Sequence, residues 1–293
     1  MADPAELAQG RYRIDGARHI IPRQSRCKEI TYLRKMGEAE EQLVASWRAE
    51  ERAQPEGWDF SDLADRMTES PEPWDLVAIY RTALAGATSV LDMGTGGGEF
   101  LRSFGDALPP DTTATEGWPP NVAVAREALA PLAVEVFEYT APDEDVDSVD
   151  MPFANNRFDL VLNRHESFSP RELARVLVEK GQFITQQVGG DEAHELKAWL
   201  GHHDELPHVN LAAMRRKLET VGFHVVEGAE HVGAYEFQDV AALVAYLQLV
   251  PWETPDDFTV DRYADRLLAL HREAAGGPVQ LTRKRFWLRA VRQ

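Results

Sequence analysis

The residues best suited to chemistry stand in a glycine-rich segment in the first half of the chain. Residues 90–101 read Val-Leu-Asp-Met-Gly-Thr-Gly-Gly-Gly-Glu-Phe-Leu, an apolar run followed by a glycine turn and a helical pattern. Glycines suit a turn that a ligand approaches closely, because they lack a side chain and tolerate positive φ. Glu116 ends the next apolar run, where a carboxylate can accept hydrogen bonds from both hydroxyls of a ribose. The combination predicts a nucleoside site.

Two classes of nucleoside cofactor compete for this site. A dinucleotide requires Gly-x-Gly-x-x-Gly, with its pyrophosphate at the helix N-terminus. Counted from Gly94, the third glycine position holds Glu99, whose charge would repel a pyrophosphate. The spacing Asp92-x-Gly94-x-Gly96-x-Gly98 instead suits S-adenosylmethionine (SAM), which brings no phosphate and carries an ammonium and a sulfonium. We therefore favour SAM over NAD, with a tight turn that binds no ligand as the structural alternative.

Further segments resemble the class I SAM-dependent methyltransferases, especially their type 11 subfamily. Residues 115–121 (TEGWPPN) are similar to that family's ribose-binding acid and adenine-flanking segment. Residues 147–153 (DSVDMPF), 156–161 (NRFDLV) and 175–183 (RVLVEKGQF) are similar to three of its later blocks. The resemblance covers about residues 72–291. It implies a Rossmann-like, doubly wound α/β fold with a seven-stranded sheet, SAM as methyl donor and S-adenosylhomocysteine (SAH) as product.

The resemblance also implies roles for individual residues. Glu116 would hold the ribose, Asp147 would bind the adenine amino group, and Ser148 would offer its backbone N–H to the ring. Trp118 would pack against adenine. The predicted cofactor-binding residues are Asp92, Gly94, Thr95, Gly96, Gly98, Glu116, Gly117, Trp118, Asp147, Ser148, Asn163 and Arg164.

His165 and Glu166 are the predicted catalytic residues, because the resemblance places their loop beside the methyl donor. Methyl transfer requires an aligned nucleophile, and needs a general base only where the acceptor must lose a proton. His165, with an ordinary pKa of about 6.5, suits that role. Glu166 suits orientation better than proton abstraction. The alternative is that one of the pair binds the backbone or the amino-acid end of the cofactor.

A metal centre is not predicted. His194, His202, His203, Asp204 and His208 are close in sequence, but their spacing matches no zinc pattern and adjacent histidines diverge on a helix. We interpret them as a polar surface loop. The single cysteine, Cys27, excludes an internal disulfide and a cysteine-rich cluster.

Composition bears on the acceptor and on location. The 293 residues include 31 Lys and Arg against 49 Asp and Glu, a net charge of -18, which disfavours nucleic acid as a partner. We expect a small-molecule acceptor, in specialised metabolism. The alternatives are an rRNA or tRNA methyltransferase and a non-catalytic SAM-binding protein. The N-terminus shows neither a basic start nor an apolar h-region, and no segment approaches transmembrane length, so we expect a cytoplasmic protein without membrane attachment.

Apolar runs that alternate with helical patterns predict a parallel sheet covered on both faces. The predicted strands are 89–92, 112–116, 134–137, 158–163, 181–187, 222–228 and 285–291. The predicted helices are 37–53, 58–67, 73–84, 99–107, 120–130, 170–179, 211–218, 238–250 and 260–275.

We expect two parts, a basic arm with a helical cap (1–71) and a SAM-binding domain (72–293). A helical insertion at about 236–275 precedes the last strand and is interpreted as a lid or as the interface of a homodimer. The arginines of the arm either grip an anionic acceptor or belong to a mobile or dimer-forming arm, which we favour. The aromatic residues of the insertion either line the acceptor pocket or pack in the core; they are Tyr235, Phe237, Tyr246, Trp252, Phe258 and Tyr263.

Overall fold

An eight-stranded sheet organises the chain, which we describe from a computed structural model. The structure describes the backbone of residues 12–14, 17–19, 23–53, 61–142, 145–201 and 206–293, and within these the side chains from residue 37 onward. The strand order is β3-β9-β10-β8-β7-β4-β5-β6. The strands are β3 (Met67–Glu69), β4 (Ser89–Met93), β5 (Asp111–Glu116), β6 (Glu135–Glu138), β7 (Phe158–Arg164), β8 (Leu177–Val188), β9 (Phe223–Phe237) and β10 (Val279–Arg292).

Strands β4 to β8 pair in parallel, whereas β10 runs antiparallel to β8 and β9, and β3 runs antiparallel to β9. Helix α3 (Leu76–Leu84) packs on one face of the parallel part, and α6 (Pro170–Val176) and α8 (Leu211–Thr220) pack on the other. The expected Rossmann-like, doubly wound α/β fold is therefore confirmed. Parallel strands linked by helices in this way place their carboxyl ends at one edge of the sheet, where ligands bind in such folds.

The expectation of seven strands was wrong. The eighth strand, β3, comes from the end of the segment 58–67 that the sequence predicted as a helix, of which residues 58–60 lie outside the described residues. Met67, Thr68 and Glu69 pair with residues 235–237 of β9. Strand β9 has 15 residues instead of the predicted seven, so its far end offers a free edge to which β3 adds. Cross-strand pairing thus takes Met67, the last residue of the predicted helix, and the two residues after it into a strand, while residues 61–66 form a 3-10 turn and a further turn of the chain.

The remaining elements complete the fold. Helices α4 (Glu99–Arg102) and α5 (Pro119–Leu129) follow β4 and β5, and a hairpin of β1 (Tyr12–Ile14) and β2 (Ala17–His19) precedes α2 (Arg23–Arg52). Helix α7 (Glu195–Leu200) follows β8, and α9 (Val240–Leu249) and α10 (Val260–Glu273) lie between β9 and β10 as expected of the insertion. Short 3-10 turns occupy Ser61–Leu63, Gly105–Ala107, Ala130–Leu132 and Pro251–Glu253.

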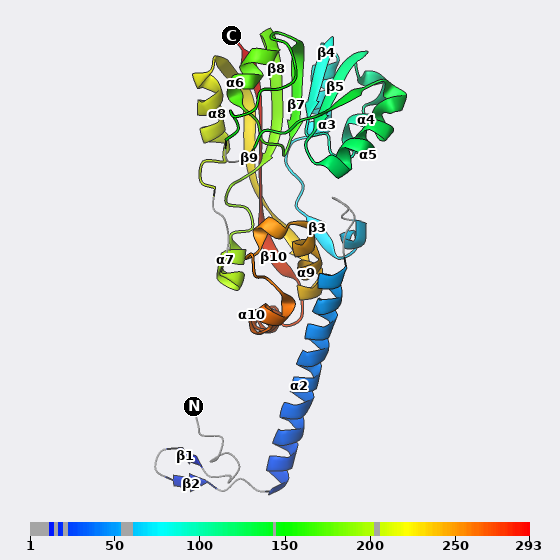
Figure 1. The fold of residues 1–293 in the computed structure, drawn as a ribbon. Coiled ribbons are helices and arrows are strands. Elements are labelled where there is room, and N and C mark those ends of the chain that lie inside the picture. The colour runs from blue at the N-terminus through cyan, green and yellow to red at the C-terminus, as the bar shows by residue number, and fades with distance from the viewer. Residues whose placement is uncertain (1–11, 15–16, 20–22, 54–60, 143–144, 202–205) are drawn as a thin grey trace.

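Strands β9 and β10 run through two lobes (Figure 1). The upper lobe holds β4 to β8 with α3 to α6 and α8, whereas the lower lobe holds β3, α7, α9, α10 and the C-terminal half of α2. At roughly 3.3 Å per residue, strands of this length are long enough to span both. The lower lobe has its own apolar core, which includes Trp47 of α2 and Phe237 of β9. Within the described residues, no helix has the length and apolar character needed to cross a membrane.

Candidate functional site

The glycine loop joins β4 to α4, and three of its glycines adopt the left-handed backbone conformation. Gly94, Gly96 and Gly98 have φ of 67°, 64° and 85°. A Cβ on Gly98 would lie 2.9 Å from Leu129, and one on Gly94 would lie 2.5 Å from the Cβ of Glu166. The loop is therefore close-packed against α5 on one side and against the segment after β7 on the other, and both positions require glycine.

Glu116 lies at the end of β5 and faces this loop. It is 7% exposed, its Oε2 accepts a hydrogen bond from the Gly96 N–H at 2.7 Å, and its Oε1 accepts one from the Trp118 N–H at 2.8 Å. A carboxylate has about four acceptor positions, so two amides leave capacity for the hydroxyls of a ribose. The Trp118 side chain is 44% exposed, and Gly117 adjoins Thr140, which lies 2.3 Å from the position of an added Cβ.

Asp92 is a buried carboxylate at the end of β4, and its chemistry fits a cationic ligand. It is 7% exposed, and burial raises its pKa to about 6, although the Thr95 hydroxyl and the Arg164 guanidinium act in the opposite direction. No described cation lies within ion-pair distance of it. The neighbouring Thr95 is also buried, and its hydroxyl lies close enough to act on the Asp92 carboxylate. These two groups, beside the Glu116 carboxylate, suit the ammonium and ribose of SAM.

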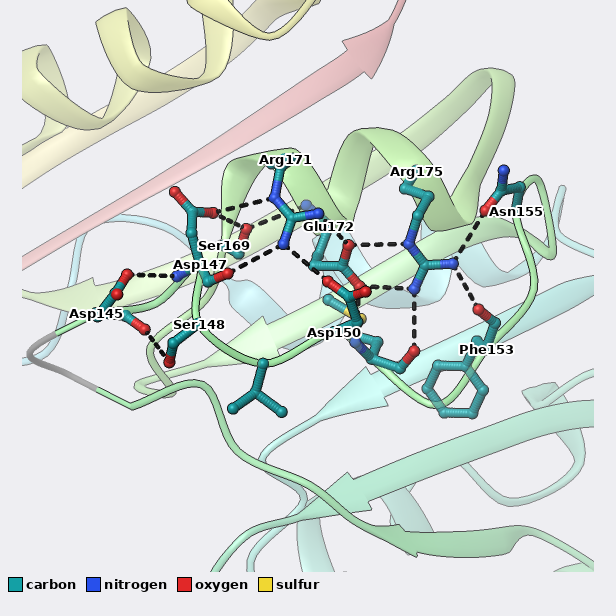
Figure 2. Close-up of polar contacts among 12 residues, drawn as sticks. Asp145, Asp147, Ser148, Asp150, Phe153, Asn155, Ser169, Arg171, Glu172 and Arg175 are labelled. Carbon is teal, nitrogen blue, oxygen red and sulfur yellow. Dashed lines mark hydrogen bonds and ion pairs between the residues drawn. The ribbon is translucent and has the colours of Figure 1, made fainter.

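Asp147 and Ser148 lie in the loop between β6 and β7, and Figure 2 shows how that loop is held. The Asp147 carboxylate accepts a hydrogen bond from the Ser169 hydroxyl, and its backbone carbonyl accepts one from Arg171 at 3.1 Å. The Ser148 N–H donates to the Asp145 carbonyl at 3.0 Å. The amide predicted to reach adenine is therefore engaged inside the turn, whereas the Asp147 side chain stays 55% exposed.

Glu172 of α6 anchors the same loop (Figure 2). Its side chain is fully buried and accepts hydrogen bonds from Arg175 at 2.6 and 2.9 Å, from Arg171 at 3.1 Å and from the Met151 N–H at 2.6 Å. Two guanidiniums and one amide offset the cost of burying this charge. Glu172 was not predicted from the sequence, because a glutamate in the first turn of a helix reads as an exposed capping residue.

The segment after β7 is held rigidly by amide side chains. Asn163 is fully buried; its Nδ2 donates to the Glu166 carbonyl at 3.1 Å, and its Oδ1 accepts from Thr185 at 2.8 Å and from Gln187 at 2.7 Å. The structure therefore uses this predicted cofactor residue to position its own loop. His165, next but one along the chain, has φ of 66°, a region that non-glycine residues rarely adopt.

His165 and Glu166 point to different sides of this segment. Glu166 packs against Gly94, and its carboxylate accepts a hydrogen bond from the Thr140 hydroxyl. His165 is exposed to a cavity of about 1100 Å³. The two predicted catalytic residues therefore connect the glycine loop to a separate chamber. This geometry agrees with an orienting role for Glu166.

The electrostatic surroundings of His165 keep its ring neutral. Desolvation by the surrounding cavity walls and the guanidiniums of Arg285, Arg164 and Arg283 lower its pKa well below 6.5. The ring still opens to the cavity, and its Nε2 lies 3.4 Å from the Gln186 amide nitrogen. A neutral imidazole at pH 7 can accept a proton or a hydrogen bond from a ligand.

Two buried arginines of β10 form the cavity floor, and neither was predicted from the sequence. Arg283 donates to Glu72 at 2.7 Å, and Arg285 donates to Glu192 and, at 2.5 Å, to the Tyr235 hydroxyl. Their signal was present in the sequence: residues 281, 283, 285 and 287 share one face of a strand and read Leu, Arg, Arg, Trp. Charges that interrupt an apolar face of a strand mark a polar site within a core.

Some aromatic residues of the insertion line the cavity and others pack in the core, the two alternatives that the sequence left open. Tyr235, Tyr246 and Trp252 line the cavity, whereas Phe237 is fully buried in the lower core and Phe258 and Tyr263 pack against each other at 5.3 Å. His202, His203 and Asp204 lie outside the described residues, and His194 and His208 are exposed. The described part of the chain holds no group of three side chains that could ligate a metal.

Comparisons with known proteins match the part of the chain that carries the glycine loop to a family of known domains. A family model described as "Methyltransferase domain" matches residues 91–185. A candidate methyltransferase of Bacillus halodurans C-125 superposes with a TM-score of 0.53 and 18% identity over 74% of this chain and 98% of its own. The YcgJ protein of Bacillus subtilis gives 0.50 and 17% over 74% and 97%. A functionally unknown protein of Deinococcus radiodurans R1 gives 0.52 and 16% over 78% and 91%. Curated proteins gave no match.

Proposed function

We propose that this chain, whose residues 91–185 are a methyltransferase domain of the type 11 family, transfers a methyl group from SAM to a small molecule. The observation that carries the proposal is a junction of two sites. Glu166 packs on the glycine loop while the adjacent His165 opens into a large cavity, so one segment borders both the expected cofactor site and a chamber for an acceptor.

The residues present suit SAM, which when bound would supply the methyl group. Asp92 would balance its positive charge, Glu116 would bind the ribose hydroxyls, and Asp147 and Trp118 would contact adenine. Arg164 and the Asn163-supported loop would border the methyl donor. His165 would accept a proton or a hydrogen bond from the acceptor, and Glu166 would hold the glycine loop and this segment in fixed relative positions.

A small acceptor is favoured over RNA by the shape and charge of the chain. A cavity of about 1100 Å³ lies slightly above the usual range of small-molecule pockets, roughly 300–1,000 Å³. A net charge of -18 opposes the phosphate contacts on which nucleic-acid binding depends. Such an acceptor fits specialised metabolism. A non-catalytic SAM-binding protein is the second candidate, and formation of SAH in the presence of an acceptor would distinguish the two.

The test is a thermal-shift panel with SAH, SAM and NAD on the wild type, Glu116→Ala and Glu135→Ala. Glu135 is the matched control, because it is an exposed glutamate at the first position of β6, whereas Glu116 stands at the last position of the neighbouring strand β5. A ligand at about 100 times its dissociation constant adds roughly 2.7 kcal/mol, a shift of several degrees. We expect SAH and SAM, but not NAD, to stabilise the wild type and Glu135→Ala, and the shift to be lost in Glu116→Ala.

Circular dichroism checks that Glu116→Ala stays folded, because the variant also removes two hydrogen bonds to loop amides. A folded wild type that SAH and SAM do not stabilise would overturn the proposal. Wild-type affinity in Glu116→Ala would instead overturn the assignment of the ribose site.

A further inference from the structure

The cavity lies where the two lobes meet, and both contribute to its walls. Trp74, which precedes α3, and Phe100 of α4 come from the upper lobe, whereas Tyr246 of α9 and Trp252 come from the lower lobe. Three apolar side chains of the lining are substantially exposed: Val77 at 37%, Leu206 at 46% and Trp252 at 53%. Flat aromatic walls and exposed apolar side chains are features of a pocket for an apolar or aromatic ligand.

The floor of this cavity is polar, and its charges are largely paired. Arg283 lies between Glu72, at 2.7 Å, and Glu69, at 3.0 Å, and Arg285 is bound to Glu192. Both arginines are less than a tenth exposed. The Nε of Arg285 is buried and has no hydrogen-bond partner among the described residues.

Arg164 differs from the two floor arginines because it has no ion-pair partner among the described residues. Its guanidinium stacks over the Phe100 ring at 4.2 Å, and both side chains line the cavity beside His165. The charges that act on His165 most strongly are those of Arg285, Arg164 and Arg283, and all of them oppose its protonation. Because Glu69 and Glu72 offset the charge of Arg283 and Glu192 offsets that of Arg285, Arg164 supplies the net positive charge at this end of the cavity.

A positive potential discriminates between acceptor atoms. It lowers the pKa of a phenol or a carboxylic acid placed there and repels an ammonium. An aliphatic hydroxyl would still remain protonated there, because its pKa is far higher and the neutral His165 is a weak base. Building on the methyl-transfer function above, we propose that the cavity binds an aromatic acceptor whose nucleophile is an acidic oxygen, a phenolate or a carboxylate, next to Arg164 and His165.

The reaction balances without a further reagent. The acceptor oxygen forms a bond to the methyl carbon while the bond from that carbon to the sulfonium sulfur breaks, and its electron pair stays on sulfur to give SAH. A phenolic proton passes to His165 Nε2 or to water, whereas a carboxylate brings none to remove. The arginines stabilise the oxygen anion before attack, so no strong base is required.

The probe for this proposal is 4-nitrophenol, whose phenolate absorbs visible light. Titrated in the presence of saturating SAH, it should bind as the phenolate, and its apparent pKa should fall by about 1 unit or more, as expected for an acid beside cationic groups. The cation 4-nitrobenzylamine, of similar size, should bind at least about tenfold more weakly. A raised pKa, or equal binding of the amine, would overturn the proposal.

Three variants locate the probe. Arg285→Gln and Arg164→Gln should each weaken phenolate binding by about tenfold or more, since a hydrogen bond to a charged group is lost. Arg289→Gln is the matched control, because Arg289 lies on β10 but pairs with the exposed Glu227 and does not line the cavity. Arg164→Gln keeps the test valid if the buried Arg285 proves necessary for folding, because the Arg164 side chain is exposed.

Calorimetric titration of SAH into the same samples separates this proposal from the function on which it rests. Without SAH binding, the methyltransferase function fails first. If SAH binds and 4-nitrophenol does not, or binds unchanged in both arginine variants, only the proposed acceptor class is wrong.

Discussion

At the scale of single residues, the candidate cofactor site carries an electrostatic cost. Asp92 is buried without an ion-pair partner among the described residues, and its pKa is raised from 3.8 to about 6. The folded protein therefore binds a proton at Asp92 more tightly than the unfolded chain does. This residue's contribution to stability is complete below about pH 4 and is lost as the pH rises through about 6.

Asp92→Asn should therefore stabilise the ligand-free protein in a pH-dependent way. From the rise in the Asp92 pKa we expect a gain in the free energy of unfolding of about 3 kcal/mol at pH 7.5, and only about half of that at pH 5. Thermal and denaturant unfolding at the two pH values would measure it. The same variant should bind SAM and SAH much more weakly, because the carboxylate that faces their positive charge is gone.

Asp111→Asn is a control of opposite sign. An ion pair with Arg157 lowers the pKa of this exposed carboxyl, so its removal should destabilise the protein modestly above about pH 4. A lower melting temperature of Asp92→Asn at pH 7.5 would contradict the electrostatic cost at Asp92, because it would mean that the ligand-free fold needs the Asp92 charge.

The residues of the candidate cofactor site could be proposed from the sequence because their chemistry is local. The glycine loop, Asp92 and Glu116 are separated by one strand-helix-strand unit, and their types alone predict a nucleoside site. Asn163 shows the limit: its position was predicted, but only the fold shows that its amide holds the Glu166 carbonyl. Arg283 and Arg285 were missed because their partners, Glu72 and Glu192, are distant in sequence.

At the scale of elements, prediction succeeded where periodicity and caps agree. Strands β4, β5 and β7 differ from their predicted bounds by one residue at most at each end, and α9 and α10 begin after the capping residues Asp239 and Thr259. Strand β9 was too short in the prediction, because Gly228 and Gly233 lie within it and local propensity reads glycines as loop. Pairing with β10 along 14 residues overrides that preference.

Helix α2 gives a prediction at this scale. Its described contacts with the rest of the protein use residues after 36: Glu40 binds Arg272, Arg48 binds Asp261, and Glu50 binds Arg66. The basic side chains of the N-terminal arm lie outside the described residues. Deletion of residues 1–36 keeps all three of these ion pairs, so we expect it to leave the melting temperature and the SAH affinity unchanged, as thermal shift and calorimetry would show.

The same deletion tests the two interpretations of the arm. Unchanged turnover and unchanged acceptor KM would exclude an arm that grips the acceptor, whereas a higher KM with constant SAH affinity would support it. A change of oligomeric state on size-exclusion chromatography would identify a dimer-forming arm. A drop in melting temperature of several degrees in a protein of unchanged oligomeric state would contradict the prediction, since it would require contacts to the body from before residue 37.

At the scale of the whole molecule, the apolar core of the lower lobe and two apolar clusters of the upper lobe are joined by the continuous strands β9 and β10. The lower core surrounds Trp47 and Phe237, while the glycine loop rests on a separate cluster in the upper lobe that contains Leu129 and Leu101. Because β9 and β10 pass through both lobes, we expect the two lobes to unfold together in one transition. The cofactor site, however, makes its described contacts only in the upper lobe.

Trp47→Ala should therefore separate stability from cofactor binding. Trp47 is 1% exposed, and removing a buried tryptophan costs about 3–5 kcal/mol. We expect a single unfolding transition at lower denaturant concentration and an SAH affinity within about twofold of wild type. The matched variant is Leu129→Ala, which should lose both stability, by about 2–5 kcal/mol, and SAH affinity, because Leu129 packs directly against Gly98. Two separate transitions in Trp47→Ala would show that the lobes are energetically independent. Equal losses of SAH affinity in both variants would show instead that the lower core supports the glycine loop through the shared strands.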